Sequence, residues 1–356
     1  MENTSGSTNN YSTPGLEIAV FIIVIAGVMA ASSVITPLLL ALFISIICSG
    51  PISWLRKKKI PQGLAIAIVF IGILAIFWGF GEIIGSSLSS FSDESAQYEE
   101  NLKEMGNTIT NFLNNKGIHI STEEISKNID PSKVMSLTSN ILGQLGGIMS
   151  NALTIIFLAL FLLLEMDSIG LKAKAIAKST KYTLSYLNTI GDNIRHYLSI
   201  KTVTSLATGI LIWIGLAIIG VEHAIIWALI AFLLNFIPTI GSIIAAIPAV
   251  LFALIQLGFG GVIWTGIVFI AVNMIIGNIV EPKLMGKGLG LSTFVVFAGL
   301  LFWGFVLGTV GMFLSVPLTM SIKIMLEQSP NTKWLAILLG TEEDATNELN
   351  DKNLLK

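Results

Sequence analysis

The sequence predicts an all-α protein that crosses a membrane several times, and three observations support this prediction. Hydrophobic residues make up 53% of the 356 residues, and the mean hydropathy is +0.82. Charged residues make up only 12% of the chain, about half of the ~25% that is usual in soluble domains. Long apolar segments recur with turn residues between them. We therefore predict a polytopic helical membrane protein with about 8 spans, each of about 20 residues.

The charge and the cysteine content exclude several other classes. The formal net charge is -2 and no long basic block occurs, which argues against nucleic acid as a partner. The single cysteine, Cys48, excludes a disulfide framework and a thiolate metal site. The polar N-terminal residues carry no Lys or Arg, so we expect no secretory signal peptide.

Apolar segments that could form membrane helices occupy 16–54, 62–86, 148–166, 202–221, 223–257, 259–280 and 291–325. The first, the fifth and the last are each about 35 residues long, which corresponds to ~50 Å of helix. Because the hydrocarbon core is only ~30 Å thick, we expect each of these three to form a helical hairpin, either two full spans or a re-entrant pair. The expected breaks are at Thr36-Pro37, Pro238-Thr239-Ile240-Gly241 and Gly308-Thr309-Val310-Gly311.

The basic residues of the loops orient these segments, because Lys and Arg concentrate in cytoplasmic loops. Arg56-Lys57-Lys58-Lys59 follows the first hairpin, and another basic loop precedes residue 202. Segment 87–147 contains eight acidic residues and no Arg, which favours the external side. This pattern predicts a multi-pass protein of the cytoplasmic membrane with both termini in the cytoplasm.

This orientation divides the chain into five regions. They are an N-terminal tail with the first membrane helices (1–86), an extracytoplasmic helical insert (87–147), a span with basic interfacial helices (148–201), a core of two span-plus-hairpin units (202–325) and a cytoplasmic tail (326–356). The basic helices of the third region would either contact anionic lipid or form a solvated face.

The two units of the core resemble each other. Hairpins 223–257 and 291–325 each follow one ordinary span, and their breaks share a Thr and a closing Gly, at Gly241 and Gly311. The orientation given above places the two hairpins on opposite sides of the membrane. We therefore predict an inverted repeat, the plan of secondary transporters in which broken helices hold a polar solute near the midplane.

Polar residues within the apolar segments are the candidate solute and ion pathway, because each costs free energy there unless it is paired or hydrated. The candidates are Asn235, Pro238, Thr239, Gly241, Asn273, Asn278, Glu281, Gly308, Thr309 and Gly311. Four prolines are expected to act as hinges: Pro37, Pro248, Pro282 and Pro317.

Two of these residues have alternative interpretations. Asn235 either lines an unwound hairpin tip or joins two helices by a hydrogen bond. Glu281 either exchanges a proton in a desolvated site or is a helix-end carboxylate that is solvated or paired with Lys283 or Lys287.

No motif predicts an enzyme. The chain has no Walker-type phosphate loop, no His-Glu-x-x-His and no Gly-x-Ser-x-Gly, and its three histidines lie in unrelated segments. We therefore expect no catalytic residues, no cofactor and no metal site.

Motifs across 235–320 resemble those of the autoinducer-2 exporter family. They are 235–241 (Asn-Phe-Ile-Pro-Thr-Ile-Gly), 278–291 with its Glu281-Pro282, Trp303-Gly304, and 307–312. The resemblance extends over essentially the whole chain. It departs at Ser292-Thr293, where the family commonly has His-Pro, so no role of that turn is transferred to this chain.

The resemblance implies a permease without ATPase parts that exports small polar solutes. Autoinducer-2 is the substrate of some members, sodium(lithium)/proton antiport is ascribed to others, and members assemble as homo-oligomers, including pentamers. We therefore expect a secondary transporter that works by alternating access and is coupled to protons or sodium, with membrane lipid around it. The alternatives are an antiporter of the same family, a passive channel, and a non-transporting scaffold whose external insert binds a partner.

Overall fold

The computed structural model describes residues 14–93, 152–166, 185–285 and 290–346, together with isolated residues in the intervening segments and Leu349. All regular structure within these ranges is helical, as the sequence predicts. The predicted external insert falls largely outside the described residues.

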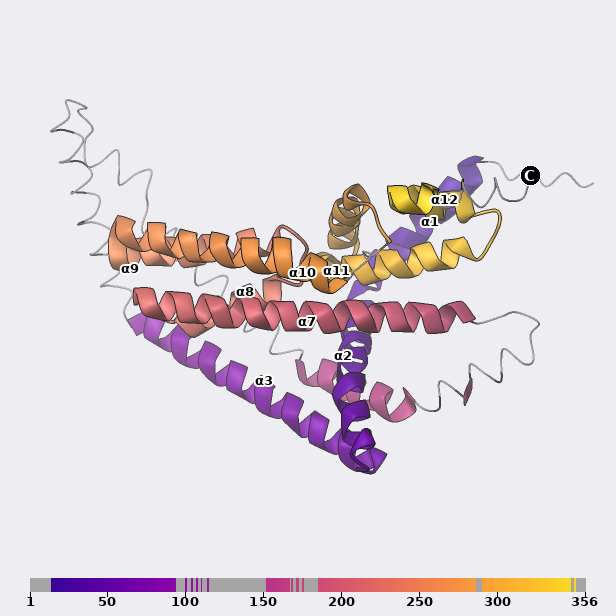
Figure 1. The fold of residues 1–356 in the computed structure, drawn as a ribbon, viewed down its shortest axis with the longest axis horizontal. Coiled ribbons are helices and arrows are strands. Elements are labelled where there is room, and N and C mark those ends of the chain that lie inside the picture. Colours follow the sequence, from indigo (N-terminus) through magenta and orange to yellow (C-terminus); the bar gives the residue numbers. More distant parts are fainter. Residues whose placement is uncertain are drawn as a thin grey trace, which may run out of the picture.

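The helices follow one another along an elongated molecule (Figure 1). They are α1 (Pro14–Ala30), α2 (Ser32–Lys57), α3 (Gln62–Asp93), the short apolar helix Ala152–Met166, α7 (Ser185–Ile219), α8 (Ala224–Leu234), α9 (Gly241–Val272), the π-helix η1 (Asn273–Val280), α10 (Glu281–Met285), α11 (Thr293–Glu327) and α12 (Lys333–Leu339).

Five helices in the described ranges are long and apolar enough to cross a membrane. They are Ser32–Lys57, Gln62–Ser86, Thr189–Ile219, Gly241–Met285 and Thr293–Glu327. Ala152–Met166 and Ala224–Leu234 are apolar but shorter. The chain is thus a multi-pass membrane protein, while the total of about 8 spans of ordinary length stays a prediction.

The hairpin predicted at Thr36-Pro37 is wrong. α2 continues through Pro37, and the break between α1 and α2 falls at Ala31, where φ is -93° and ψ is 8°. The two helices follow one another end to end instead of folding back (Figure 1). A proline within a helix removes one backbone donor, and membrane helices tolerate this loss. The expectation of a cytoplasmic N-terminus depended on this hairpin and loses its support.

The break predicted at Pro238-Thr239-Ile240-Gly241 is present. Residues 235–240 are not helical, and Thr239 has a left-handed φ of 59°. The ring centroids of Trp227 in α8 and Phe252 in α9 lie 5.3 Å apart, so α9 folds back along α8. A Cβ on Gly241 would lie 1.8 Å from the carbonyl oxygen of Leu234, so this reversal requires glycine.

Two further reversals, at Gly258 and Gly308, have nearly the same backbone geometry as each other. Gly258 within α9 has φ 68° and ψ -156°, and Gly308 within α11 has φ 68° and ψ -152°. A Cβ on Gly261 would lie 2.7 Å from a carbonyl oxygen of the preceding helix, and a Cβ on Gly311 would lie 1.9 Å from one. The sequence predicts the break at Gly308, and a boundary between apolar segments coincides with Gly258.

The reversals at 235–241 and at 308–311 contribute neighbouring side chains to one contact. The rings of Phe236 and Phe313 stack with their centroids 4.6 Å apart and their planes at 13°. α8 and α9 extend from this region toward one end of the molecule, and α11 and α12 lie toward the other (Figure 1). This arrangement is consistent with opposed hairpins, while the inverted repeat in the membrane stays a prediction.

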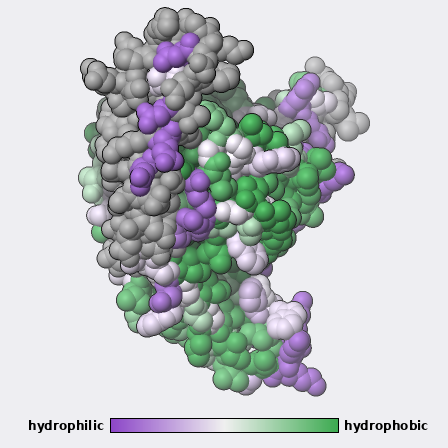
Figure 2. Space-filling view, turned by 90° about the vertical axis from the view of Figure 1, so that its left-hand side faces the viewer, coloured by the Kyte–Doolittle hydropathy of each residue, from purple (hydrophilic) through white to green (hydrophobic). Residues whose placement is uncertain are grey.

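Hydrophobic packing holds α7 against α8 and α9. The largest cluster of buried apolar residues joins Ile212 and Leu216 of α7 to Trp227 of α8 and Phe252 of α9. Outside this core, hydrophobic residues cover much of the described surface, with hydrophilic residues toward its edges (Figure 2). Such a surface suits a surrounding lipid phase.

Candidate functional site

α7 carries a buried row of polar side chains along one face. Tyr197, Lys201, Thr204, Ser205 and Thr208 are each at most 5% exposed. Residues three or four apart share a face of a helix, so these five form a single stripe, which we call the α7 polar row. Polar groups buried in an apolar helix are costly unless they are paired or used, which makes the row the candidate functional site.

Lys201 forms a buried ion pair with Glu281, the first residue of α10. Its Nζ lies 2.6 Å from Glu281 Oε1, and the two side chains are 5% and 16% exposed. Thr204 Oγ1 lies 3.2 Å from the carbonyl oxygen of Lys201 and 3.5 Å from Glu281 Oε2, and it donates to these acceptors. The sequence suggested Lys283 or Lys287 as the partner of Glu281. The structure pairs Glu281 with Lys201, and Lys287 lies outside the described residues.

The π-helix η1 precedes Glu281 directly. π-Helical segments are rare and occur frequently at functional sites, and this one spans Asn273–Val280. Asn273 is half-buried, and its Oδ1 lies 3.0 Å from the place where a Cβ on Gly277 would be. Because η1 widens the turn before α10, it helps to set the direction from which Glu281 approaches α7.

Asn235 joins the first reversal to the α7 polar row. Its Nδ2 donates a hydrogen bond of 3.0 Å to Ser205 Oγ, and both side chains are buried. Asn235 therefore joins the first reversal to α7 by a hydrogen bond. This agrees with the interpretation that Asn235 connects two helices, and not with the one that it lines an unwound hairpin tip. One turn further along α7, Thr208 Oγ1 is buried and has no hydrogen-bond partner among the described residues, so the row has unused hydrogen-bonding capacity.

The other predicted pathway residues lie elsewhere. Thr239, Asn278 and Thr309 are exposed, and Thr239 Oγ1 donates to the carbonyl oxygen of its own neighbour Pro238. Gly241, Gly308 and Gly311 shape the reversals. Three of the four expected hinges, Pro37, Pro248 and Pro317, lie inside helices that continue through them, and Pro282 is the second residue of α10.

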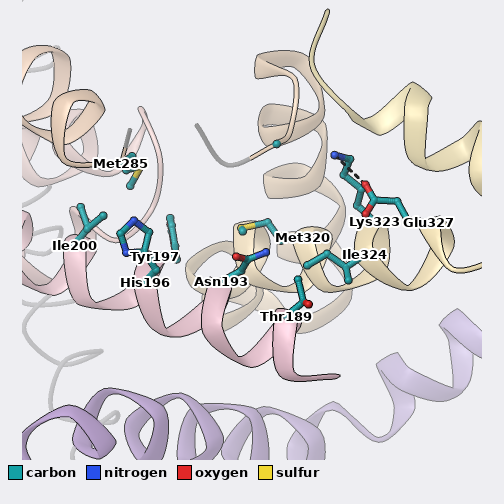
Figure 3. Close-up of a pocket in the computed structure, with 11 residues that line it drawn as sticks. Thr189, Asn193, His196, Tyr197, Ile200, Met285, Met320, Lys323, Ile324 and Glu327 are labelled. Carbon is teal, nitrogen blue, oxygen red and sulfur yellow. Dashed lines mark ion pairs between the residues drawn. The ribbon is translucent and has the colours of Figure 1, made fainter. Parts of the chain in front are cut away.

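A cavity of about 260 Å³ adjoins one end of the α7 polar row. Tyr197 belongs both to the row and to the wall of the cavity, so the two are continuous. Figure 3 shows polar side chains of α7 facing α11 across this space. The polar lining residues are Thr189, Asn193, His196, Tyr197, Lys323 and Glu327.

Lys323 connects this cavity to the C-terminal segment. Its Nζ lies 3.2 Å from Glu327 Oε1 and 2.9 Å from Asp344 Oδ2. The backbone N–H of Thr341 also donates to Asp344 Oδ2. Burial alone would raise the pKa of the Asp344 carboxyl, but hydrogen bonds from Lys323 and Thr341 outweigh it and hold that pKa below its usual value.

The depressed pKa of Asp344 predicts an acid-sensitive contact. A carboxyl of this kind stabilises the fold above its usual pKa, and the contribution is lost as the pH falls through the lower folded value. Asp344→Asn should therefore lower the free energy of unfolding at pH 7 by at most about 1 kcal/mol, since the carboxylate is partly solvated. It should also flatten the pH dependence of the unfolding temperature below about pH 5. Glu343→Gln, at an exposed neighbour, is the control and should change neither quantity.

Ser292 has a structural role at the point where the motifs depart from the resembled family. Its side chain accepts a hydrogen bond from the backbone N–H of Val295 and so caps α11. Its own N–H donates to the carbonyl oxygen of Leu339 at the end of α12. The start of α11 is thereby held against the C-terminal segment.

Sequence reasoning missed Lys201, Tyr197, Thr204, Ser205 and Thr208. The available signal was the recurrence of polar residues at helical spacing at the start of apolar segment 202–221, with a lysine at its edge. Among the residues that the structure describes, no group of three or more His, Cys, Asp or Glu side chains could hold a metal ion.

Comparisons with known proteins agree with this membrane architecture. The family model described as AI-2E family transporter matches residues 18–331. A Haemophilus influenzae protein whose name assigns it provisionally to transport is 43% identical over 335 residues, covering 92% of this chain and 96% of the relative. The AI-2 transport protein TqsA of Escherichia coli K12 is 36% identical over 330 residues, which cover 92% of this chain and 96% of TqsA.

Proposed function

Because the chain belongs to the AI-2E transporter family, we propose that it is a secondary transporter of a small polar solute resembling autoinducer-2. The name of the relative TqsA supports this class of solute. The observation that carries the proposal is the α7 polar row, whose Lys201 forms a buried ion pair with Glu281 of α10 inside a membrane helix bundle.

The chemistry of the row suits an uncharged solute with several hydroxyl groups. Hydroxyl and amide side chains both donate and accept hydrogen bonds, and Thr208 has capacity to spare. The ion pair adds a local dipole without net charge, so it need not attract an ion of either sign strongly. A solute that leaves the cavity beside Tyr197 would next meet Lys201, Thr204 and Ser205.

The reversals give the transporter parts that can move relative to each other. Hairpins 223–257 and 291–325 touch at Phe236 and Phe313, and each also contains one proline within a helix, Pro248 and Pro317. In the proposed alternating access, these hairpins shift around the row, with Asn235 and Glu281 contacting the solute or the coupling ion. The basic turn at 56–59 and the C-terminus are proposed to face the cytoplasm.

Transport by the full chain in proteoliposomes tests this function. Saturable uptake of autoinducer-2, or of another small polar solute, should appear under an imposed proton or sodium gradient. Glu281→Gln should abolish the gradient-driven part, because it removes the ionisable group of the pair while retaining its size. Flux that does not saturate would indicate a channel, and absence of flux for every solute would contradict the proposal and favour a scaffold.

The buried charge pair also favours a second candidate, sodium(lithium)/proton antiport. The same vesicles distinguish it, because an antiporter moves protons in response to a sodium gradient without any organic solute. A proton flux under these conditions that Glu281→Gln removes would favour antiport over solute export.

A further inference from the structure

The π-helix η1 determines where the Glu281 carboxylate lies, because Glu281 itself makes a π-type hydrogen bond at the end of η1. Its backbone N–H donates to the carbonyl oxygen of Ile276, five residues back. At the start of η1, the N–H of Asn273 still donates to carbonyl oxygens three and four residues back. The hydrogen-bond spacing therefore widens from the α-helical to the π-helical register within η1, immediately before the residue that pairs with Lys201.

Pro282 makes a second acceptor available to the same N–H. In the π register the carbonyl of Gly277 would receive its hydrogen bond from position 282, five residues ahead, but proline has no backbone N–H. At α-helical spacing the donor for this carbonyl is the N–H of Glu281, four residues ahead. Glu281 can thus donate to Ile276 or to Gly277, and either choice uses its single N–H once. The two registers therefore differ little in backbone hydrogen bonding.

The side chains of η1 also permit a turn of this segment. Gly277 has no side chain, and an added Cβ there would lie 3.0 Å from Asn273 Oδ1. Met274, Ile275 and Ile279 are 57%, 51% and 50% exposed. In a membrane these apolar side chains face lipid, which is as apolar as they are. Turning η1 therefore exchanges one apolar side chain for another at the lipid surface.

A change of register would displace the Glu281 carboxylate. A shift of one position in an α-helix is a turn of about 100° and an advance of about 1.5 Å. On a helix with a Cα radius of about 2.3 Å, this turn moves a Cα by at least about 3 Å, and Val280 would take approximately the place of Glu281. The ion pair, with Nζ of Lys201 2.6 Å from Oε1, would be broken by such a movement.

We propose that η1 is a register switch. In the first state the N–H of Glu281 donates to Ile276, and the carboxylate pairs with Lys201. In the second state the same N–H donates to Gly277, and the carboxylate turns away from α7. The proposal rests on the proposed transport function, because it assigns the exchange of register to the step at which an ion or solute replaces Lys201 as the partner of the carboxylate.

The distance between spin labels on α7 and α10 tests the switch without any measurement of flux. The labels are attached to Val203→Cys and Leu284→Cys, at two exposed side chains, in the full chain with the buried Cys48 replaced by alanine and in nanodiscs. Glu281→Gln removes the charge that holds the first register. It should shift the distance between the labels by about 3 Å.

Two glycine variants repeat this test without altering the ion pair. Gly277→Ala favours the α-helix, and its Cβ crowds Asn273 Oδ1 in the π register, so it should shift the distance in the same direction as Glu281→Gln. Gly266→Ala makes the same chemical change in an α-helical part of α9, where a Cβ meets nothing within 4 Å. This control should leave the distance unchanged.

Deletion of Ile279 removes the second register. It takes one residue out of the widened segment, so a plain α-helix would place Glu281 close to its present position. This variant should retain its unfolding temperature, and adding Glu281→Gln should no longer shift the distance. The control is deletion of Ile263, an exposed residue of α9. It should lower the unfolding temperature, because it turns the buried Phe269 and Val272 out of the core.

The distance and the flux have separate outcomes. Equal distances in the wild type, Glu281→Gln and Gly277→Ala would overturn the register switch, as would a shift that persists after deletion of Ile279. In proteoliposomes the deletion variant should lose gradient-driven flux, and full flux in this variant would also overturn the switch. A distance shift together with absence of flux in the wild type would support the switch and contradict the proposed transport function.

Discussion

Lys201→Met is expected to abolish transport and to destabilise the protein strongly. The substitution leaves Glu281 as a largely buried carboxylate without its cation, 2.6 Å from where Nζ was. Removal of one partner from a buried ion pair costs about 3–5 kcal/mol. The remaining contact, with Thr204 Oγ1 at 3.5 Å, is too long to compensate. Unfolding in detergent and flux in proteoliposomes measure the two effects.

Two further variants separate stability from transport. Lys201→Met combined with Glu281→Met removes both charges and should recover most of the stability without restoring gradient-driven flux. Lys283→Met removes an exposed lysine two residues from Glu281 and should leave both quantities unchanged. Normal coupled flux in Lys201→Met would show that the ion pair takes no part in transport.

Gly241→Ala and Gly311→Ala are each expected to destabilise the protein by about 3 kcal/mol or more and to abolish flux. An added Cβ would lie 1.8 Å from the carbonyl oxygen of Leu234 in the first case, and 1.9 Å from that of Trp303 in the second. These contacts are with backbone, so a rotamer change cannot relieve them. The reversal itself must open, and the stacking of Phe236 on Phe313 would be lost.

Gly266→Ala is the matched control for these variants. Gly266 lies in the second arm of α9, beyond the reversal at Gly258, and a Cβ there would meet nothing within 4 Å. Because alanine is a better helix former than glycine, this variant should keep its flux and unfold at the same or a slightly higher temperature. If the alanine variants at 241 and 311 behaved like Gly266→Ala, tight reversals would not be required for transport.

The fold class and two of the three expected breaks could be predicted, because apolar segments too long for a membrane must bend at their Pro and Gly residues. The prediction failed at Pro37 for an identifiable reason. Proline removes one hydrogen bond, but the reversals at Gly258 and Gly308 use φ values of 68°, which glycine adopts readily. Residues 31–37 contain no glycine, and the helix continues.

The site could be predicted only in part. Glu281 was conspicuous as an acidic residue close to an apolar segment, and Asn235 as an amide within one. Lys201 lay at the edge of a basic loop, and the identity of a residue at a helix boundary does not reveal a partner 80 positions away. The π-helical turns of η1 also escape an analysis based on a period of 3.6 residues.

The pairing of Lys201 with Glu281 also affects how readily α10 can separate from α7. Any rearrangement that moves α10 away from α7 exposes two opposite charges to a low-dielectric environment, at several kcal/mol per ion. Such a rearrangement becomes accessible when an ion or a polar solute compensates those charges. In the proposed ion-coupled transporter, the empty protein would therefore be biased against cycling, and the contact that joins the two helices would also limit dissipation of the ion gradient.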